Sequence, residues 1–464
     1  PCSLLSRWTS ALMSINRLLI ANRGEIAVRV NRAARALGME VVQVVSAADR
    51  DSLAAELADR AVVIGPGPAQ ASYLRPELIV HAAMRTGCQA IHPGYGFLSE
   101  RPELPRLCDD NGLVFVGPTP EIISLLGDKL QARRLAEEVG VPLLPGSDQI
   151  GSVEDALAVA AGIGFPVLIK AAAGGGGRGM FIARSNEEIS ASFDKSAAEA
   201  QEAFGDGTLY MERYIEHARH VEVQVLGDGK GKVVHFGERD CSVQRRYQKV
   251  IEEAPCTVMP ADIKAQLHKV AVDLVAAVNY RNAGTVEFLY DLDRQGFYFI
   301  EVNARIQVEH PVSECITGAD LVQWQLRLAR GEALTLEQSD IAITGHALEC
   351  RINAEDPHRD FLPQPGRLSR WSAPQGDAVR LDTHCREGAM IPPYYDSLMA
   401  KLITTGDTRE EAVTRMNAAL AELEIEGLAT NRDLHSFITS HPDFIQNQFH
   451  TKWLEQTGLP AFLA

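Results

Sequence analysis

Residues 165–182 read Phe-Pro-Val-Leu-Ile-Lys-Ala-Ala-Ala-Gly-Gly-Gly-Gly-Arg-Gly-Met-Phe-Ile. Two apolar runs flank a glycine-rich connection, which predicts a β-hairpin with a mobile tip. The connection is not a Walker A loop, because no Gly-Lys-Ser/Thr follows it, and not a dinucleotide fingerprint, because it leads into a strand and not into a helix. A disordered surface loop and a flap whose backbone N–H groups close over phosphates remain. Lys170, at the end of the first run, favours the flap because a point cation is useful beside phosphates.

Residues 297–310 carry the most informative polar pattern and read Phe-Tyr-Phe-Ile-Glu-Val-Asn-Ala-Arg-Ile-Gln-Val-Glu-His. If this run is extended, its side chains alternate between two faces. One face then holds Glu301, Asn303, Arg305, Gln307 and Glu309. Glu and Asn are poor strand formers, so a merely solvated strand face is the weaker interpretation. Two carboxylates, an amide and a guanidinium can together hold divalent metals, an oxyanion and a general base.

Glu287, in Gly-Thr-Val-Glu, supplies a further inward-facing carboxylate. With Glu301 and Asn303 it forms an all-oxygen set suited to Mg²⁺. No cluster of thiolates or histidines suggests zinc. Glu301 and Glu309 are far enough apart in the sequence to serve separately as metal ligand and general base.

The segment 220–254 is dense in charge, and His220, Glu222 and Gln224 fall on one face of a predicted strand. Such density is often a salt-bridged surface, but it also suits a site for phosphate and carbonate anions. Cys241 and Lys249 could form a basic pair, although a buried structural thiol is the favoured interpretation of the cysteine.

Three other positions give weaker signals. Lys129 is more typical of a solvated lysine near a helix start. Glu212 lies in a run that could present backbone groups to a purine. For Arg351, a structural salt bridge and a functional role are equally supported.

Strand–helix alternation in the first third of the chain, beginning with the apolar run 18–21, predicts a doubly wound parallel sheet. A ligand crevice is expected at its strand ends, beside the loop 92–100. We expect three units, at 15–143, 144–214 and 215–460. Later strands are predicted at 221–226, 232–236, 284–290 and 297–303, and helices at 261–278 and 409–423.

Composition narrows the class of protein. The chain has 464 residues and a net charge of −16, which argues against nucleic acid as the main partner. No apolar run approaches the roughly 18 residues of a membrane helix. Eight cysteines without a CxxC pair indicate a reducing, cytoplasmic compartment. Residues 1–12 are expected to be an added leader, and a transit-peptide remnant, which would imply the mitochondrial matrix, is the alternative.

Taken in order along the chain, these segments resemble the biotin carboxylase component of the biotin-dependent carboxylases, in the ATP-grasp superfamily. The matching runs begin with Ile-Ala-Asn-Arg-Gly-Glu-Ile-Ala at 20–27 and His-Pro-Gly-Tyr-Gly-Phe-Leu-Ser-Glu within 91–100. The others are 127–129, 174–180, 238–242, 301–311, 345–357 and 392–397. Each run alone is weak to moderate evidence for the family, but the whole set in this order is specific to it. The resemblance implies an N-terminal Rossmann-like α/β domain (15–143), an ATP-grasp lid (144–214) and a C-terminal mixed α+β domain (215–460).

The resemblance also implies a set of site residues. ATP would lie between lid and body, bound by Lys129, Lys170, Gly175, Gly176, Glu212, Ile215, His220 and Gln244. Mg²⁺ or Mn²⁺ would be held by Glu287, Glu301 and Asn303. Bicarbonate would meet Lys249, Arg305, Gln307, Val308 and Glu309, and biotin would meet Tyr95, Gly96 and Arg351. Glu309, Arg351, Arg305 and Lys249 would be catalytic.

The implied reaction uses Glu309 to deprotonate bicarbonate for attack on the γ-phosphate of ATP. The resulting carboxyphosphate breaks into CO₂ and phosphate, phosphate takes the ureido proton of biotin, and Arg351 stabilises the biotin anion that captures CO₂. Three positions depart from the family pattern, namely Ala173, Tyr247 and Ala304. None of them removes a charged catalytic group. They are therefore expected to affect lid mobility and nucleotide affinity more than the reaction itself.

The family serves acetyl-CoA, propionyl-CoA, methylcrotonyl-CoA, pyruvate and urea carboxylases. No Ala-Met-Lys-Met biotin-attachment motif occurs here, so biotin is expected on a separate carrier protein or on a domain outside this sequence. The leading expectation is a free-standing acetyl-CoA carboxylase subunit, homodimeric, with a biotin carrier and a carboxyltransferase as partners. Neither nucleic acid nor membrane is an expected partner.

Two other functions deserve weight. Another ATP-grasp ligase that hands an acyl phosphate to an amine would share the lid and the metal acids, but not Glu309, Arg351 and the 91–100 loop in this arrangement. A catalytically silent scaffold would lack a metal acid or a lysine, and none is missing. A Rossmann-type dehydrogenase is excluded because no dinucleotide fingerprint follows the first strand.

Overall fold

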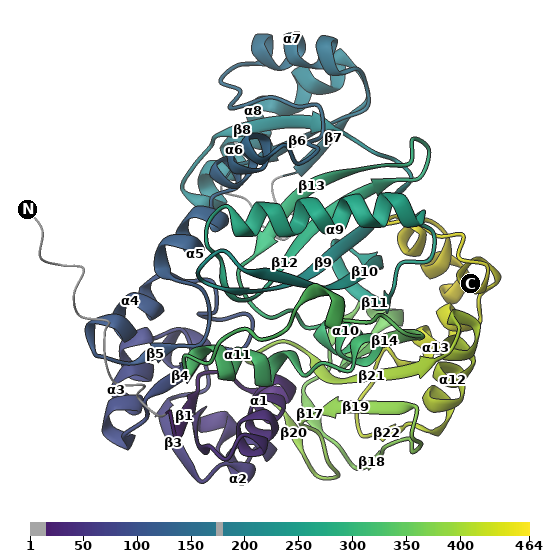
Figure 1. Cartoon of the computed structure of the whole chain (residues 1–464). Helices are drawn as coiled ribbons and strands as arrows, with labels where there is room; N and C mark the ends of the chain where they lie inside the picture. Colours follow the sequence, from purple (N-terminus) through teal and green to yellow (C-terminus); the bar gives the residue numbers. More distant parts are fainter. Residues whose placement is uncertain (1–14, 173–179) are drawn as a thin grey trace, which may run out of the picture.

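The computed structural model describes residues 15–172 and 180–464. The predicted flap tip, including Ala173, Gly175 and Gly176, lies outside the described residues. Figure 1 shows a small lid at one end of the molecule and a larger body that contains the two main sheets. Within the described ranges, no helix is both long enough and apolar enough to cross a membrane.

The N-terminal region is a five-stranded parallel sheet in the order β3-β2-β1-β4-β5. The prediction of a doubly wound sheet is therefore confirmed. Its strands are β1 (Arg17–Ile20), β2 (Glu40–Ser46), β3 (Arg60–Gly65), β4 (Ala90–His92) and β5 (Val114–Phe115). Its helices are α1 (Gly24–Ala36), α2 (Leu53–Leu57), α3 (Pro76–Thr86) and α4 (Glu103–Asp110), and α5 (Pro120–Gly127) leads out of it.

The lid is a three-stranded antiparallel sheet in the order β7-β6-β8. Val167 pairs with Ala183, which confirms the hairpin predicted around the glycine run. The elements of the lid are α7 (Val153–Ile163), β6 (Val167–Ala171), β7 (Met180–Ala183), α8 (Asn186–Phe204) and β8 (Leu209–Arg213), and α6 (Lys129–Val139) precedes them. The lid has its own core, formed by residues between Ile150 and Met211. The unit boundaries at 143/144 and 214/215 stay a prediction.

The body is built on an eight-stranded antiparallel sheet in the order β13-β12-β9-β10-β11-β14-β21-β19. Its strands are β9 (Ala218–Asp228), β10 (Val233–Arg245), β11 (Gln248–Ala254), β12 (Arg281–Asp291), β13 (Gly296–Asn303), β14 (His346–Asn353), β19 (Val379–Thr383) and β21 (Leu398–Gly406). Its helices are α9 (Ala261–Ala276), α10 (His310–Thr317), α11 (Leu321–Ala329), α12 (Arg409–Glu422), α13 (Arg432–Ser440), α14 (Pro442–Ile445) and α15 (Leu459–Leu463). Figure 1 shows α9 lying across β9 and β10.

The C-terminal part of the body also contains three short antiparallel strand pairs. They are β15 (Glu355–Asp356) with β16 (Leu362–Pro363), β17 (Gly366–Arg367) with β20 (Met390–Ile391), and β18 (Arg370–Ser372) with β22 (Glu424–Glu426).

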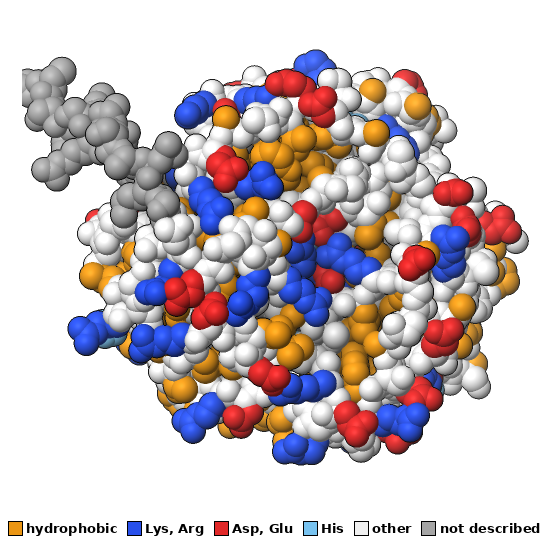
Figure 2. All heavy atoms as spheres, turned by 60° about the horizontal axis from the view of Figure 1, so that its bottom comes forward, with side chains coloured by type: hydrophobic (Ala, Val, Ile, Leu, Met, Phe, Trp, Pro, Cys, Tyr) orange, Lys and Arg blue, Asp and Glu red, His pale blue; other side chains and the backbone are white. Residues whose placement is uncertain are grey.

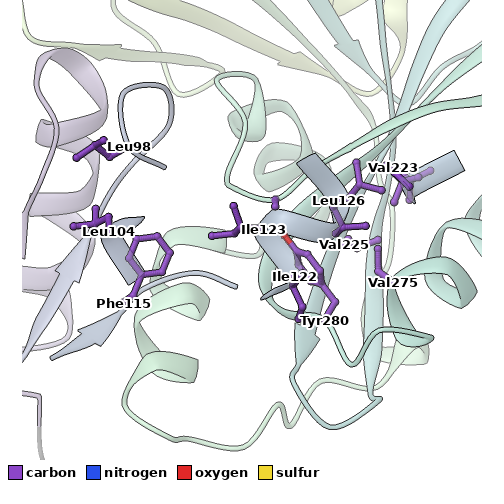
Figure 3. Packing of buried hydrophobic residues seen from close by; sticks show 14 of the residues in the cluster. Leu98, Leu104, Phe115, Ile122, Ile123, Leu126, Val223, Val225, Val275 and Tyr280 are labelled. Carbon is purple, nitrogen blue, oxygen red and sulfur yellow. The ribbon is translucent and has the colours of Figure 1, made fainter. Parts of the chain in front are cut away.

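One hydrophobic cluster joins the parallel sheet to the long antiparallel sheet (Figure 3). Ile123 on α5 lies between Phe115 of the first sheet and Val225 of the second. Burial of such a side chain stabilises the fold by about 1.5–3 kcal/mol. This shared core fixes the N-terminal sheet against the strands that carry the polar residues described below.

The extended run expected at 297–310 is confirmed only in part. Strand β13 ends at Asn303, and residues 304–309 form a turn that leads into α10 at His310. The backbone N–H of Ala304 donates to the Glu100 carboxylate at 3.1 Å, so a contact with the N-terminal region replaces further pairing with β12. The expected alternation is wrong beyond Asn303, since Ile306, Gln307 and Glu309 are all buried.

Candidate active site

A row of charged side chains crosses four neighbouring strands of the long sheet. Arg239 on β10 lies opposite Glu222 on β9, Glu222 lies opposite Glu287 on β12, and Glu287 lies opposite Glu301 on β13. Directly opposed residues point to the same face of a sheet, and like charges in that position are destabilising. Three adjacent carboxylates therefore require cations between them.

Lys249, on the neighbouring strand β11, supplies the central cation. Its Nζ donates to Glu222 at 2.5 Å, to Glu287 at 2.9 Å and to Glu309 at 2.6 Å. Burial alone would lower the pKa of the Lys249 ammonium, but these three carboxylates raise it well above the ordinary lysine value. All three N–H donors of the lysine are in use, so an incoming anion must replace one of the carboxylates.

Glu309 is fully buried at the start of α10, where it is the N-terminal cap residue. One carboxylate oxygen accepts from Lys249, and the other accepts from the Arg351 guanidinium at 2.9 Å. Burial would raise the pKa of this carboxyl, but Lys249, Arg351 and Arg239 hold it well below the usual glutamate range. Glu309 is therefore ionised at neutral pH and can accept a proton.

Arg351, on β14, also donates to Glu252 at 2.5 Å. The contact with Glu252 fits a structural salt bridge, and the contact with the candidate base Glu309 fits a functional role. The Cys241 thiol lies 3.9 Å from Glu309 Oε1, and burial together with Glu222 raises the pKa of the thiol well above its ordinary value. A thiol that stays protonated fits the structural interpretation of Cys241.

The turn after β13 forms a second set of contacts around Glu287. Arg305 donates to the Asn303 side-chain oxygen at 2.9 Å, to Gln307 at 2.8 Å and to Glu100 at 2.7 Å. The amides of Asn303 and Gln307 in turn donate to Glu287 at 2.9 and 3.1 Å.

The carboxylate of Glu287 therefore has four donors. His220 bonds its other oxygen at 2.9 Å, in addition to Lys249, Asn303 and Gln307. Burial would raise the pKa of Glu287, but Lys249 and His220 lower it well below the ordinary value. Basic and acidic side chains also gather near the centre of the face shown in Figure 2.

A large cleft between lid and body adjoins this cluster. It encloses about 1080 Å³ of space, open solvent included. The six described residues predicted to bind nucleotide all line it, namely Lys129, Lys170, Glu212, Ile215, His220 and Gln244. Glu287 and Glu301 also line it, whereas Asn303 does not.

The lysines reach the cleft from defined elements. Lys129 opens α6, where the Asp128 side chain caps the backbone N–H groups of Leu130 and Gln131 at 3.0 Å each. Lys170, on β6, lies 2.5 Å from Glu212 on β8, and Arg133 contacts the other oxygen of Glu212 at 2.7 Å. Two cations therefore hold the Glu212 carboxylate.

Sequence reasoning missed the apolar walls of the cleft. These are formed by Leu144, Leu168, Met180, Leu289, Phe299 and Ile300. It also missed Thr451 and Lys452, which reach the cleft from near the C-terminus. Tyr247 lines the cleft with a φ of +64°, and the Lys452 ammonium lies 4.4 Å from the centre of its ring. No local sequence signal marks Thr451 or Lys452.

The residues predicted to bind metal offer oxygen donors, and their roles as ligands stay a prediction. Glu301 faces the cleft, and its ion pair with Lys129 is long, at 3.9 Å. Burial and repulsion from Glu287 raise the pKa of Glu301, whose nearest cation among the described residues is this distant Lys129. Two opposed carboxylates suit Mg²⁺, which prefers oxygen ligands. Asn303 could join only if its oxygen released Arg305.

Two other groups have ligand atoms within 4.8 Å of one another, namely His220 with Glu222 and Glu287, and Glu222 with Cys241 and Glu309. Lys249 bonds two carboxylates in each group, those of Glu222 and Glu287 in the first and those of Glu222 and Glu309 in the second.

Two of the three residues predicted to bind biotin, Tyr95 and Gly96, line a separate pocket of about 420 Å³, open solvent included. Its walls include Arg23, Glu25 and Asp396, and Arg351 is not among its lining residues. The Tyr95 hydroxyl donates to the Glu25 carboxylate. Among the described residues, the structure thus brings those predicted for nucleotide, metal and bicarbonate together and places Tyr95 and Gly96 in another pocket.

Comparison with known proteins gives consistent matches over almost the whole chain. Residues 14–123 match the model "Biotin carboxylase, N-terminal domain", residues 128–337 match "Carbamoyl-phosphate synthase L chain, ATP binding domain", and residues 349–456 match "Biotin carboxylase C-terminal domain".

Three relatives illustrate the range. Biotin carboxylase 1 of Bacillus subtilis is 49% identical, over 95% of this chain and 98% of its own. A pyruvate carboxylase component from Methanothermobacter thermautotrophicus is 46% identical, over 95% and 90%. The crystal structure of the biotin carboxylase domain dimer of Hydrogenobacter thermophilus 2-oxoglutarate carboxylase, in complex with MgADP, ADP and bicarbonate, superposes with a TM-score of 0.91. It is 44% identical and covers 97% of this chain and 98% of that one.

Proposed function

The chain belongs to the biotin carboxylase family, and from this premise we propose that it carries out the first half-reaction of an acyl-CoA carboxylase, with acetyl-CoA as the acceptor. Its activity is the ATP- and bicarbonate-dependent carboxylation of biotin, and it is an ATP-dependent ligase. ATP, Mg²⁺ and biotin are its cofactors and carried substrate. The residue roles below are part of the proposal.

One observation carries the assignment of the base. Glu309 is a buried, ionised carboxylate held between two cations, Lys249 and Arg351. Bicarbonate that enters this site would take up donors of Lys249, Arg305 and the Gln307 amide. Lys249 would then bond Glu309 less strongly, and the carboxylate would become more basic when its substrate arrives. Glu309 would remove the bicarbonate proton, and the bicarbonate oxygen would attack the γ-phosphate.

The remaining charges serve the same step. Lys129 and Lys170 would bind the phosphates of ATP, and Glu287 and Glu301 would hold the metal. Mg²⁺, when bound, would neutralise the charge that develops on the transferring phosphoryl group. The lid would keep water from the carboxyphosphate, which breaks down to CO₂ and phosphate.

Arg351 would act in the second step. After phosphate takes the ureido proton of biotin, the negative charge on the ureido oxygen needs a fixed cation. Arg351 is partly buried beside the carboxylates of Glu252 and Glu309, and Glu309 would be protonated at that stage. Loss of the Glu309 charge would leave the positive charge of Arg351 less balanced by carboxylates when the biotin anion forms.

The acceptor and the partners come from the relatives by similarity. Relatives of nearly equal identity include pyruvate and 2-oxoglutarate carboxylases. Sequence identity therefore does not select the acceptor, and acetyl-CoA is our proposal. We further propose a biotin carrier protein and a carboxyltransferase as partners, and a homodimer like that of the 2-oxoglutarate carboxylase domain.

The activity is tested by ATP hydrolysis with Mg²⁺, with and without bicarbonate and free biotin. Turnover that depends on bicarbonate and rises with biotin supports the proposal. ATP use indifferent to both would instead favour another ATP-grasp ligase. The acceptor is tested by adding a carrier and carboxyltransferase pair from an acetyl-CoA, propionyl-CoA or pyruvate carboxylase and identifying which pair is charged and discharged.

A further inference from the structure

Lys401 is a fully buried cation outside the site described above. It stands in the middle of β21, in the otherwise apolar run Leu-Met-Ala-Lys-Leu-Ile at 398–403. Its exposed fraction is 0%. An ammonium group is costly to bury unless it is paired and hydrogen-bonded. The contacts of Lys401 therefore indicate why the fold retains it.

Two contacts from Lys401 reach two different parts of the candidate site. Nζ donates to the backbone carbonyl of Val308 at 2.8 Å, and Val308 is the residue before the candidate base Glu309. Nζ also lies 3.1 Å from Glu25 Oε1 on α1. The same oxygen of Glu25 accepts from the Tyr95 hydroxyl, at the pocket predicted for biotin.

These contacts form one chain, from the Val308 carbonyl through Lys401 and Glu25 to Tyr95. It joins the turn that presents Glu309 to the loop that presents Tyr95, two segments that are over 200 residues apart in the sequence. Glu25 Oε2 is buried without a hydrogen-bond partner among the described residues, so its contacts to Lys401 and Tyr95, both through Oε1, orient the carboxylate.

We propose that Lys401 is a positioning residue that couples the Glu309 turn to the Tyr95 loop, so that bicarbonate activation and biotin binding share one geometry. The inference rests on the proposed function of Glu309 and Tyr95. Carboxyphosphate is useful only if biotin is in place when it breaks down, and a rigid link between the two segments would enforce that coincidence.

A purely structural role is the competing explanation. Lys401 lies opposite Asp382 on β19 and near the buried Glu349, whose two carboxylate oxygens have no partner among the described residues. A cation that only balances these acids would affect stability alone. The two explanations differ in what happens to coupling between ATP hydrolysis and biotin carboxylation.

The test compares Lys401→Met with wild type in three measurements: KM for free biotin, KM for ATP, and ATP hydrolysed per carboxybiotin formed. We expect a KM for biotin raised roughly tenfold, the effect of losing one charged hydrogen bond, and a raised ATP-to-carboxybiotin ratio. KM for ATP should stay within about twofold. A ratio and a KM for biotin equal to those of wild type would overturn the proposal.

Two further variants keep the result decisive. In a Tyr95→Phe background, Lys401→Met should add little to the KM for biotin, because both substitutions break the same chain, whereas full additivity would contradict the link. If Lys401→Met does not fold, Glu25→Gln breaks the ion pair with a smaller change and should raise the same ratio. Arg409→Met is the matched control, since it removes a different, largely buried cation that pairs with the buried Glu253.

The control Arg409→Met should lose stability and keep the wild-type ratio of ATP hydrolysed to carboxybiotin formed. If wild type itself shows no bicarbonate-dependent carboxylation of biotin, then the proposed function fails, and that result is distinct from an unchanged ratio in Lys401→Met.

Discussion

Lys249 and Glu287 form an ion pair of 2.9 Å at the junction of the nucleotide cleft and the candidate bicarbonate site. Lys249 also bonds Glu222 and Glu309, so a single ammonium group contacts three carboxylates from different segments of the chain. The metal side and the base side of the site therefore share one cation. A substitution on the metal side should therefore change the ion pairs on the base side, and the reverse.

Lys249→Met should both destabilise and inactivate the protein. Removal of one partner from a buried ion pair leaves uncompensated charge and costs about 3–5 kcal/mol. We expect a lower urea midpoint of unfolding and loss of bicarbonate-dependent ATP hydrolysis. Lys249→Arg, which retains the charge, should recover most of the stability but little activity, since the guanidinium does not match the three-way geometry. An unchanged unfolding midpoint in Lys249→Met would contradict the central role of this cation.

Glu301→Gln should separate metal binding from folding. The pKa of Glu301 is raised, so its ionised form is less stable in the folded protein than in the unfolded chain at neutral pH. Without metal, the Gln variant should therefore melt at a higher temperature than wild type. With saturating Mg²⁺ and ADP, the variant should gain less thermal stability than wild type.

Thermal denaturation at increasing Mg²⁺ concentration measures both effects. The matched control is Glu202→Gln, at an exposed position on α8, which should change neither. A Glu301→Gln protein that responds to Mg²⁺ as wild type does would remove Glu301 from the metal site.

Glu253 should contribute to acid sensitivity of the fold. Burial would raise the pKa of its carboxyl, but Arg409 and a hydrogen bond from His346 lower it to about 2. The unfolded value is about 4.3, so ionised Glu253 stabilises the folded protein above that pH by about 3 kcal/mol. This contribution is lost as the pH falls from about 4.3 towards 2.

Urea unfolding at a series of pH values tests this. Glu253→Gln should be less stable than wild type at pH 7, and the difference should shrink between about pH 4.5 and pH 2. A difference that stays constant across that interval would show that the carboxylate is not responsible.

The sequence pattern was sufficient for much of the fold, whereas most of the site residues were implied by the family resemblance and stay a prediction. Strand–helix alternation predicts the parallel sheet, and apolar runs on both sides of a glycine-rich connection predict the β6–β7 hairpin. Polar residues at every second position predict His220, Glu287 and Glu301 on one face of a sheet, and the structure places them around one cleft.

Other features depend on contacts between distant segments, which local patterns do not contain. The end of β13 at Asn303 follows from the bond between Ala304 and Glu100, about 200 residues apart. Thr451 and Lys452 reach the cleft because the C-terminal segment lies beside the start of β9, where the Thr451 N–H donates to the Ala218 carbonyl at 2.9 Å. Lys401 did carry a signal, a lone charge within an apolar strand, but its partners Val308 and Glu25 come from elsewhere.

The most direct test of the account is Glu309→Gln, assayed for bicarbonate-dependent ATP hydrolysis and for transfer of labelled bicarbonate to free biotin. Glu314→Gln is the matched control, because Glu314 is buried on the same helix but pairs with Arg29 and Arg380. We predict that Glu309→Gln binds ATP normally and loses both activities by about 10²–10⁴-fold, the usual contribution of a general base, while the control stays active. Activity in Glu309→Gln within about twofold of wild type would contradict the assignment of Glu309 as the base.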